Sequence, residues 1–197
     1  MDIMDDNGLS WRSESDKIVI LHIPKCASTT IRTHIYTMKT DMNTFDRTDY
    51  RLLAVVRDPV KRFISGLNAI HYAPQKVCFF EDNNYKKGTW LQKALYTLNH
   101  VKQGIYYNIH IVPQTWFHNN KEGIPFGIDD YIKFEDFNAE ILRTTGIKNN
   151  HHINQQTIHE GGIKDVINYQ EVIHEIKNAY SKDFECYKQH TGETLYE

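Results

Sequence analysis

Apolar and polar residues alternate in blocks over the first third of the chain. An apolar, β-branched run at residues 18–23 predicts a buried strand, which ends at Pro24. A loop follows that contains one lysine, small residues and three consecutive hydroxyl side chains. Ile31 and Ile35 then stand four residues apart, the spacing of one helix face. The pattern therefore predicts a strand, a tight loop and a helix over about residues 29–38.

A second block has the same order. Residues 51–56 form another apolar run, Arg57 ends it, and Pro59 suits the first position of a helix that we expect to run to about Asn68. Residues 40–50, between the two blocks, are polar and turn-like. Two strands separated by a helix are typical of a βαβ crossover and a parallel sheet. We therefore predict an α/β fold class: a three-layer sandwich with a short parallel sheet, helices on both faces and a ligand at the carboxyl ends of the strands.

Further along the chain, four segments have a regular pattern of their own. Amphipathic periodicity predicts three helices, and a short β-branched and aromatic run predicts one strand. These segments cover about residues 90–101 (helix), 130–137 (strand), 138–145 (helix) and 171–185 (helix). Residues 71–87 have no clear period, and we interpret them as a loop-rich stretch that shapes a substrate cleft.

Composition and charge limit the domain organisation and the partners. The chain has 197 residues, of which 40% are hydrophobic, enough for a sizeable core. We interpret residues 1–16 as a polar N-terminal lead-in and residues 17–197 as a single domain, since no repeat or linker interrupts them. A formal net charge of −2 gives no reason to expect nucleic acid or an anionic membrane as a partner.

The same composition indicates a cytoplasmic protein. No run approaches the roughly 20 apolar residues of a membrane span, and the first residues are acidic rather than signal-like. The three cysteines, Cys26, Cys78 and Cys186, are scattered and include no CxxC pair. They therefore favour neither a disulfide framework nor a zinc site, and a reducing compartment is the simplest interpretation.

The loop after the first strand has the chemistry of an anion site. Backbone N–H groups and the positive end of a helix dipole face such an anion, hydroxyl groups donate to it, and Lys25 adds a full charge. An ordinary strand-to-helix turn with Ser28 or Thr29 as N-cap is the structural alternative. Arg57, at the end of the second strand, and Ser65, on the following helix, can converge on a second anion.

Together the two blocks resemble the sulfotransferases that use 3′-phosphoadenosine 5′-phosphosulfate (PAPS). The resemblance implies that the first loop is a P-loop-like phosphosulfate-binding loop and that the segment 56–65 holds the 3′-phosphate through Arg57 and Ser65, with no metal required. The residues it assigns to the phosphosulfate are Lys25, Cys26, Ala27, Ser28, Thr29 and Thr30.

Later segments resemble the carbohydrate O-sulfotransferase branch of that family. They are a His-x-x-Pro-Gln segment at residues 110–114, a Lys-Phe-Glu strand ending at 133–135, a His/Asn-containing loop at 151–154 and the closing helix. This branch implies a carbohydrate, or another hydroxyl-bearing acceptor, as partner. Secreted-pathway members carry a membrane anchor and cysteines shortly after Pro-Gln. Here residues 115–128 contain no cysteine, which fits a cytoplasmic setting.

The resemblance also implies catalytic roles. Sulfuryl transfer is an in-line displacement in which negative charge builds on the bridging oxygen, and Lys25 would stabilise that charge. The acceptor hydroxyl must lose a proton, and histidine suits that task near neutral pH. His110, close to an expected strand end, is the first candidate for the base. The other candidates are His71, His151, Asp46 and Asp49.

Two other functions remain open on the sequence. A P-loop-type nucleotide kinase would have the same strand, loop and helix order, with Asp58 as a magnesium ligand. Its G-x-x-x-x-G-K-[ST] loop needs glycines, however, and this loop has none. A non-catalytic PAPS- or sulfated-glycan-binding domain is the other alternative. Binding of ATP–Mg²⁺ would favour the kinase, and turnover with an acceptor would distinguish an enzyme from a binding domain.

Overall fold

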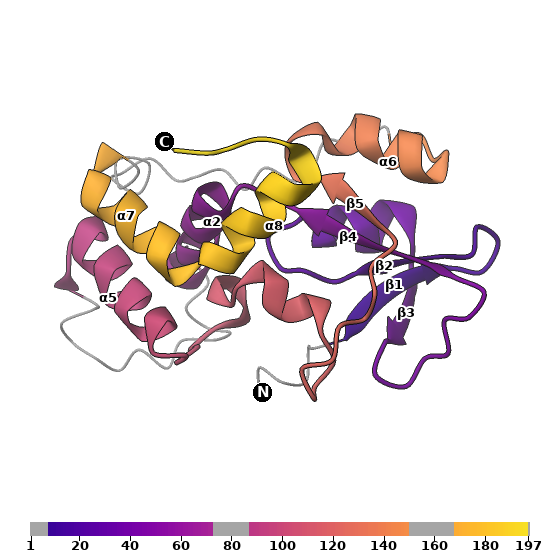
Figure 1. Cartoon of the computed structure of the whole chain (residues 1–197), viewed down its shortest axis with the longest axis horizontal. Coiled ribbons are helices and arrows are strands. Elements are labelled where there is room, and N and C mark those ends of the chain that lie inside the picture. The colour runs from indigo at the N-terminus through magenta and orange to yellow at the C-terminus, as the bar shows by residue number, and fades with distance from the viewer. Residues whose placement is uncertain (1–7, 73–86, 150–167, 197) are drawn as a thin grey trace. The chain divides into compact units, whose positions relative to one another are not determined.

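The structure, a computed structural model, describes residues 8–72, 87–149 and 168–196 (Figure 1). The chain forms two compact units, each assembled from two separate segments. The first unit contains residues 1–57 and 114–155, and the second contains residues 58–113 and 156–197. The single domain predicted for residues 17–197 stays a prediction. The predicted loop at 151–154 lies outside the described residues.

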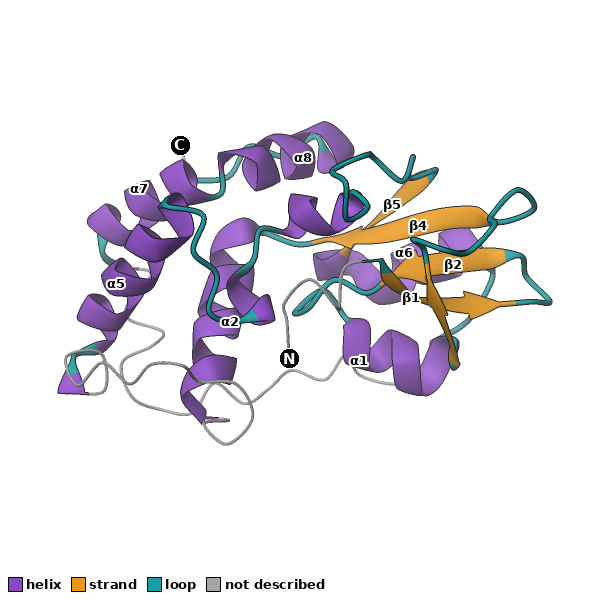
Figure 2. Ribbon diagram, turned by 90° about the horizontal axis from the view of Figure 1, so that it is seen from below, coloured by secondary structure: helices purple, strands orange, loops and turns teal. Residues whose placement is uncertain are grey.

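The first unit contains a five-stranded sheet with the strand order β3-β1-β2-β4-β5 (Figure 2). Its strands are β1 (Leu9–Ser13), β2 (Ile18–Leu21), β3 (Met38–Asp41), β4 (Arg51–Val56) and β5 (Asp130–Lys133). The strands β2, β4 and β5 are parallel, which confirms the α/β class and the predicted parallel pairing. The sheet as a whole is mixed, because β1 runs antiparallel to both β2 and β3.

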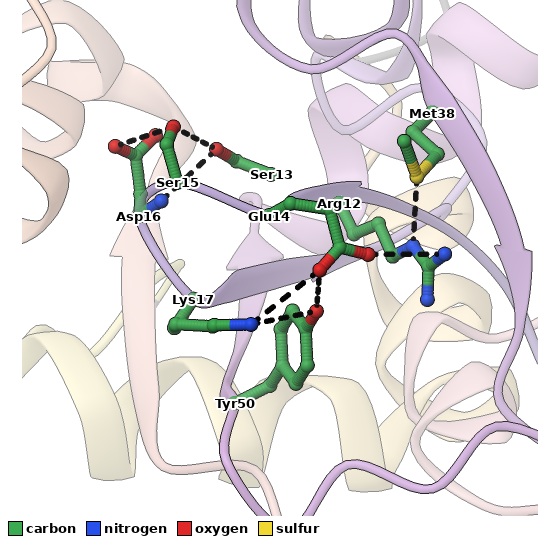
Figure 3. A network of polar contacts seen from close by, with 8 residues as sticks. All are labelled: Arg12, Ser13, Glu14, Ser15, Asp16, Lys17, Met38 and Tyr50. Atoms are coloured by element: carbon green, nitrogen blue, oxygen red, sulfur yellow. Dashed lines mark hydrogen bonds and ion pairs between the residues drawn. The ribbon is translucent and has the colours of Figure 1, made fainter.

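Strand β1 is where the structure differs from the polar lead-in predicted for residues 1–16. Ser10 and Trp11 are buried in the sheet, and Ser10 pairs with Leu21 of β2. The polar side chains that follow lie at the end of β1 and in the turn to β2, where they bond one another (Figure 3). The Tyr50 hydroxyl donates to Glu14, whose other carboxylate oxygen lies 3.1 Å from the Arg12 guanidinium. Their polarity thus stabilises a hairpin.

The central strands are buried along their length. Every residue of β2 is buried, and so is every residue of β4 after Arg51. Strands covered on both faces need continuous apolar runs rather than an alternating pattern, which is why these two could be located from the sequence. The predicted bounds of β4 are confirmed.

The helix predicted over residues 29–38 is shorter than expected. A single turn, α1 (Ser28–Thr30), continues into a π-helical turn (Ile31–Ile35), and β3 begins at Met38. The segment is rich in isoleucine and threonine, whose branched Cβ atoms disfavour a long α-helix. The last residue of the predicted helix, Met38, instead begins β3, which pairs with β1. The helix α6 (Phe137–Thr145) also belongs to this unit and ends, as predicted, at Thr145, with Gly146 as its C-cap.

The second unit is helical. Among the described residues, its α-helices are α2 (Pro59–Tyr72), α5 (Trp90–Lys102), α7 (Gln170–Ala179) and α8 (Ser181–Thr191). In both views α5 lies beside α7, and apolar side chains of these helices share one core. The helix predicted over 171–185 is divided at Tyr180, whose backbone is not helical, with φ at −121° and ψ at 30°. Its side chain is buried, and its hydroxyl donates to the Ile111 carbonyl at 2.6 Å.

Candidate functional site

The loop between β2 and α1 has an unusual backbone. Lys25 and Ala27 have φ angles of 68° and 58°, in the left-handed region, although neither is glycine. Left-handed residues cost roughly 1–2 kcal/mol each when they carry a Cβ. Such strain is held in place by surrounding contacts and is found at ligand sites more often than elsewhere. Turns of this kind can also aim several backbone N–H groups at one anion.

The start of α1 does not match the structural alternative of an ordinary capped turn. Its N-cap position is occupied by Ala27, and no side chain caps the helix. Neither Ser28 nor Thr29 therefore serves as the N-cap. Ser28 is partly exposed, Thr29 is exposed and Thr30 is buried, so the three hydroxyl groups face different surroundings. No side chain therefore accepts a hydrogen bond from the first N–H groups of α1, the position that a bound anion would fill.

Lys25 and Arg57, predicted to hold two different phosphate groups, are in contact. The Arg57 guanidinium donates from Nη1 to the Lys25 carbonyl oxygen at 2.7 Å. The same guanidinium lies over the ring of Phe134, with 4.2 Å from Cζ to the ring centroid. Phe134 directly follows β5, and Arg57 directly follows β4. The carboxyl ends of β2, β4 and β5 thus bring these three residues together.

Gln114 also belongs to this cluster, although sequence reasoning gave it no role. Its side chain is fully buried and bonds both backbone groups of Arg57. The Arg57 N–H donates to Oε1 at 3.1 Å, and Nε2 donates to the Arg57 carbonyl at 3.0 Å. The thiol of Cys26 lies 3.7 Å from the same Oε1. In the sequence, Pro113-Gln114 was informative only through the family resemblance.

Ser65 and His110 lie in the second unit. Ser65 is partly exposed on α2, and the next residue, Gly66, packs against the His110 backbone carbonyl. A Cβ at Gly66 would collide with that carbonyl. His110 is in a short 3₁₀ helix, η3 (Ile109–Ile111), so the strand end predicted near it is wrong. The chain turns there because Asn108 caps η3 by accepting from the His110 N–H at 2.9 Å.

The imidazole of His110 is oriented by the same side chain. The buried Asn108 places Oδ1 2.6 Å from Nδ1 of His110. Since this oxygen already accepts from a backbone N–H, it can only accept from the ring as well, which puts the proton on Nδ1. Nε2 of the neutral ring then carries the lone pair. This is the arrangement a general base needs.

The other candidates for the base differ in their surroundings. Burial and the nearby Lys93 ammonium lower the pKa of His71, whose Nδ1 lies 3.5 Å from Lys93 Nζ. Hydrogen bonds from the Thr48 hydroxyl and N–H lower the pKa of Asp46, which makes it a weaker base. Asp49 is exposed, and His151 lies outside the described residues.

Neither a metal-ligand group nor a membrane-crossing helix occurs among the described residues. No group of three or more His, Cys, Asp or Glu side chains that could hold a metal ion occurs among them. None of the described helices combines the length and the apolar character that a membrane crossing requires.

Taken by itself, the first unit defines a class: an α/β protein with a basic, strained loop and an arginine at the carboxyl ends of adjacent parallel strands. In open α/β sheets, ligands bind outside the carboxyl ends of the parallel strands. The family comparison is more specific, because the model of the sulfotransferase family matches residues 10–189. The chain therefore belongs to the sulfotransferase family, as its sequence motifs predicted. Searches of curated proteins and of solved structures gave no match.

Proposed function

We propose that this protein transfers a sulfuryl group from PAPS to an acceptor hydroxyl, on a carbohydrate. One observation carries the proposal beyond the family: the Arg57 guanidinium bonds the carbonyl of Lys25. Two residues 32 positions apart, each expected to bind an anionic part of the donor, are thereby held together at one edge of the sheet. The carbohydrate acceptor rests on the resemblance of residues 110–114 to the carbohydrate branch.

The proposed reaction is a single displacement. The acceptor oxygen forms a bond to sulfur while the bond from sulfur to the bridging oxygen breaks, and 3′-phosphoadenosine 5′-phosphate leaves. The Lys25 ammonium stabilises the charge that develops on the leaving oxygen, and loop N–H groups with Ser28, Thr29 and Thr30 hold the phosphate. The acceptor proton goes to a general base. His110 is the first candidate, because Asn108 leaves its Nε2 able to accept a proton.

The surroundings of Asp58 weaken the case for a kinase, in which this residue would be a magnesium ligand. One carboxylate oxygen caps α2 by accepting from the N–H groups of Val60, at 2.8 Å, and Lys61, at 3.2 Å. The other accepts from the hydroxyl of Tyr196 at 2.7 Å. Asp58 is 2% exposed. Its side chain thus has a structural task that explains its presence without a magnesium ion.

Two measurements test the proposal. Isothermal titration should show binding of 3′-phosphoadenosine 5′-phosphate without a metal, and weaker binding of ATP–Mg²⁺. Incubation with labelled PAPS and a glycan panel should then transfer label to at least one acceptor. Tight binding of ATP–Mg²⁺ alone would favour a kinase, and donor binding without transfer to any hydroxyl-bearing acceptor would favour the non-catalytic binding domain.

A further inference from the structure

Gln114 opens a 3₁₀ helix, η4 (Gln114–His118), and its carboxamide is wholly inside the first unit. We propose that Gln114 is a positioning residue for donor binding, which fixes Arg57 and the Lys25 loop in relation to each other. The inference rests on the proposed function, because it concerns the site in which the donor would bind.

Gln114 bonds the backbone of Arg57 just beyond the point where strand pairing ends. The parallel pairing of β4 with β5 ends at Val56 and Lys133, so Arg57 is the first residue beyond the ladder. Its N–H and carbonyl both bond to the carboxamide of Gln114, at 3.1 and 3.0 Å. A primary amide offers one acceptor and one donor side, which matches these two backbone groups. The backbone from which the guanidinium extends is therefore fixed by Gln114.

The remaining contacts link the same carboxamide to the loop. The Cys26 thiol, a weak donor, lies 3.7 Å from Oε1 of Gln114. The guanidinium of Arg57 returns to the loop by donating to the Lys25 carbonyl at 2.7 Å. Three segments distant in sequence thus form one polar network, in which Gln114 and Cys26 are buried. Buried networks of this kind hold their members in one arrangement when they are satisfied.

A positioning role makes a specific prediction about Arg57. If Gln114 aims the guanidinium, removing the Arg57 side chain should matter less once Gln114 is gone. If Gln114 only stabilises the fold, the two effects should be independent. A double-mutant cycle separates these cases, because contacting residues with a shared function give non-additive effects.

The first test uses Gln114→Met, which keeps the length and volume of the side chain and removes both hydrogen bonds. Gln114→Met should weaken binding of 3′-phosphoadenosine 5′-phosphate about tenfold. The loss caused by Arg57→Ala should be at least about threefold smaller in the Gln114→Met background than in the wild type. Ser10→Ala, which alters another fully buried polar side chain in the same unit, is the control and should leave nucleotide affinity unchanged. Equal Arg57→Ala losses in the two backgrounds would overturn the inference.

The second test uses Gln114→Glu and gives an answer even where Gln114→Met does not fold. A carboxylate keeps the acceptor for the Arg57 N–H but loses the donor, and it faces the Arg57 carbonyl. Protonation restores a donor, so the affinity of Gln114→Glu relative to wild type should recover between about pH 8 and pH 6. A ratio that stays constant over this range contradicts a positioning role. Wild-type protein that does not bind 3′-phosphoadenosine 5′-phosphate overturns the proposed function as well. A second outcome overturns only the role of Gln114. In it the wild type binds the nucleotide, the affinity losses of Gln114→Met and Arg57→Ala are additive, and the relative affinity of Gln114→Glu does not change with pH.

Discussion

Asn108 holds the imidazole of His110 with a single oxygen, which accepts from the backbone N–H at 2.9 Å and lies 2.6 Å from Nδ1. Because asparagine is neutral, this contact fixes the tautomer without adding a charge that would favour the imidazolium. In its neutral form, a histidine held in this way carries its lone pair on Nε2, as a base for an acceptor hydroxyl must.

Removing the imidazole is the direct test of His110. His110→Ala should lower kcat by about 10²–10⁴-fold, the usual contribution of a general base, and leave donor affinity near that of the wild type. His100→Ala is a suitable control, since His100 is also a partly buried histidine of the second unit, bonded through Nδ1 to the Tyr96 carbonyl. Steady-state kinetics with titration of 3′-phosphoadenosine 5′-phosphate would measure both quantities. A near-normal kcat would remove His110 from the mechanism and make His71 the next candidate.

A carboxylate in place of the amide should change the pH dependence. In Asn108→Asp a negative charge next to Nδ1 favours the imidazolium and so raises the pKa of His110. The base is active only when neutral, so the acidic limb of the kcat profile should move to higher pH, by about one unit. Rate profiles between pH 5 and pH 9 for both proteins would measure the shift. An unmoved limb would mean that the titrating group seen in kcat is not His110.

Arg57 has two roles that a comparison of ligands can separate. Its guanidinium bonds the Lys25 carbonyl and is also expected to bind the 3′-phosphate. Arg57→Ala should weaken binding of 3′-phosphoadenosine 5′-phosphate by about 1.5–3 kcal/mol, the range of a charge-assisted hydrogen bond. Adenosine 5′-phosphosulfate lacks the 3′-phosphate, so the substitution should weaken its binding much less. Calorimetric titration of both ligands decides the matter, and equal losses would show that Arg57 acts only by shaping the loop.

His22 should make the stability of the fold depend on pH. Burial, and then the positive charges of Arg32 and Lys39, lower its pKa from 6.5 to about 4. Because the folded pKa lies below the unfolded one, the unfolded state binds more protons between these values, and stability falls as the pH drops through that window.

Between pH 7 and pH 5 this effect should cost about 2 kcal/mol of the free energy of unfolding. Urea unfolding at the two pH values would measure it in wild type and in His22→Gln, whose side chain stays neutral. The wild type should lose about 2 kcal/mol more than the variant. Equal losses in the two proteins would mean that His22 does not titrate differently on folding.

The sequence predicted those parts of the fold and site that depend on local patterns. The strand over residues 51–56 and the start of α2 at Pro59 follow from a continuous apolar run and from the fixed φ of proline. Strands β1 and β3 were missed because each forms by pairing with another strand, β3 with β1 and β1 with β2. No local pattern reports such pairing in short, polar segments.

The residues of the candidate site also differ in whether a local sequence pattern could identify them. Lys25 and Arg57 could be selected because each follows an apolar strand, where charged side chains meet at the sheet edge. Gln114 could not be selected from any local pattern, since it acts on backbone groups of a residue 57 positions away. The left-handed backbone of Ala27 was equally hidden, because alanine has no preference for that conformation.

Lys25 gives the most direct test of the proposed chemistry, because its hydrogen bond with Arg57 does not depend on its side chain. Arg57 bonds the backbone carbonyl of Lys25, and this bond remains in Lys25→Ala. The fold and the loop should therefore survive the substitution, with an unchanged melting temperature. The ammonium stabilises the leaving oxygen most strongly in the transition state, so its loss should appear in kcat and not only in KM.

Lys25→Ala should lower kcat by about 10²-fold or more, on the scale of one preorganised electrostatic group. Lys25→Arg should restore only part of the rate, because a planar guanidinium does not place its charge where the ammonium was. Lys17→Ala is a matched control: Lys17 is also a lysine of the first unit with left-handed backbone, at φ 52°. It should keep the wild-type rate. If Lys25→Ala folds, binds 3′-phosphoadenosine 5′-phosphate and turns over as fast as Lys17→Ala, the leaving oxygen is stabilised by another group and the proposed role of Lys25 is wrong.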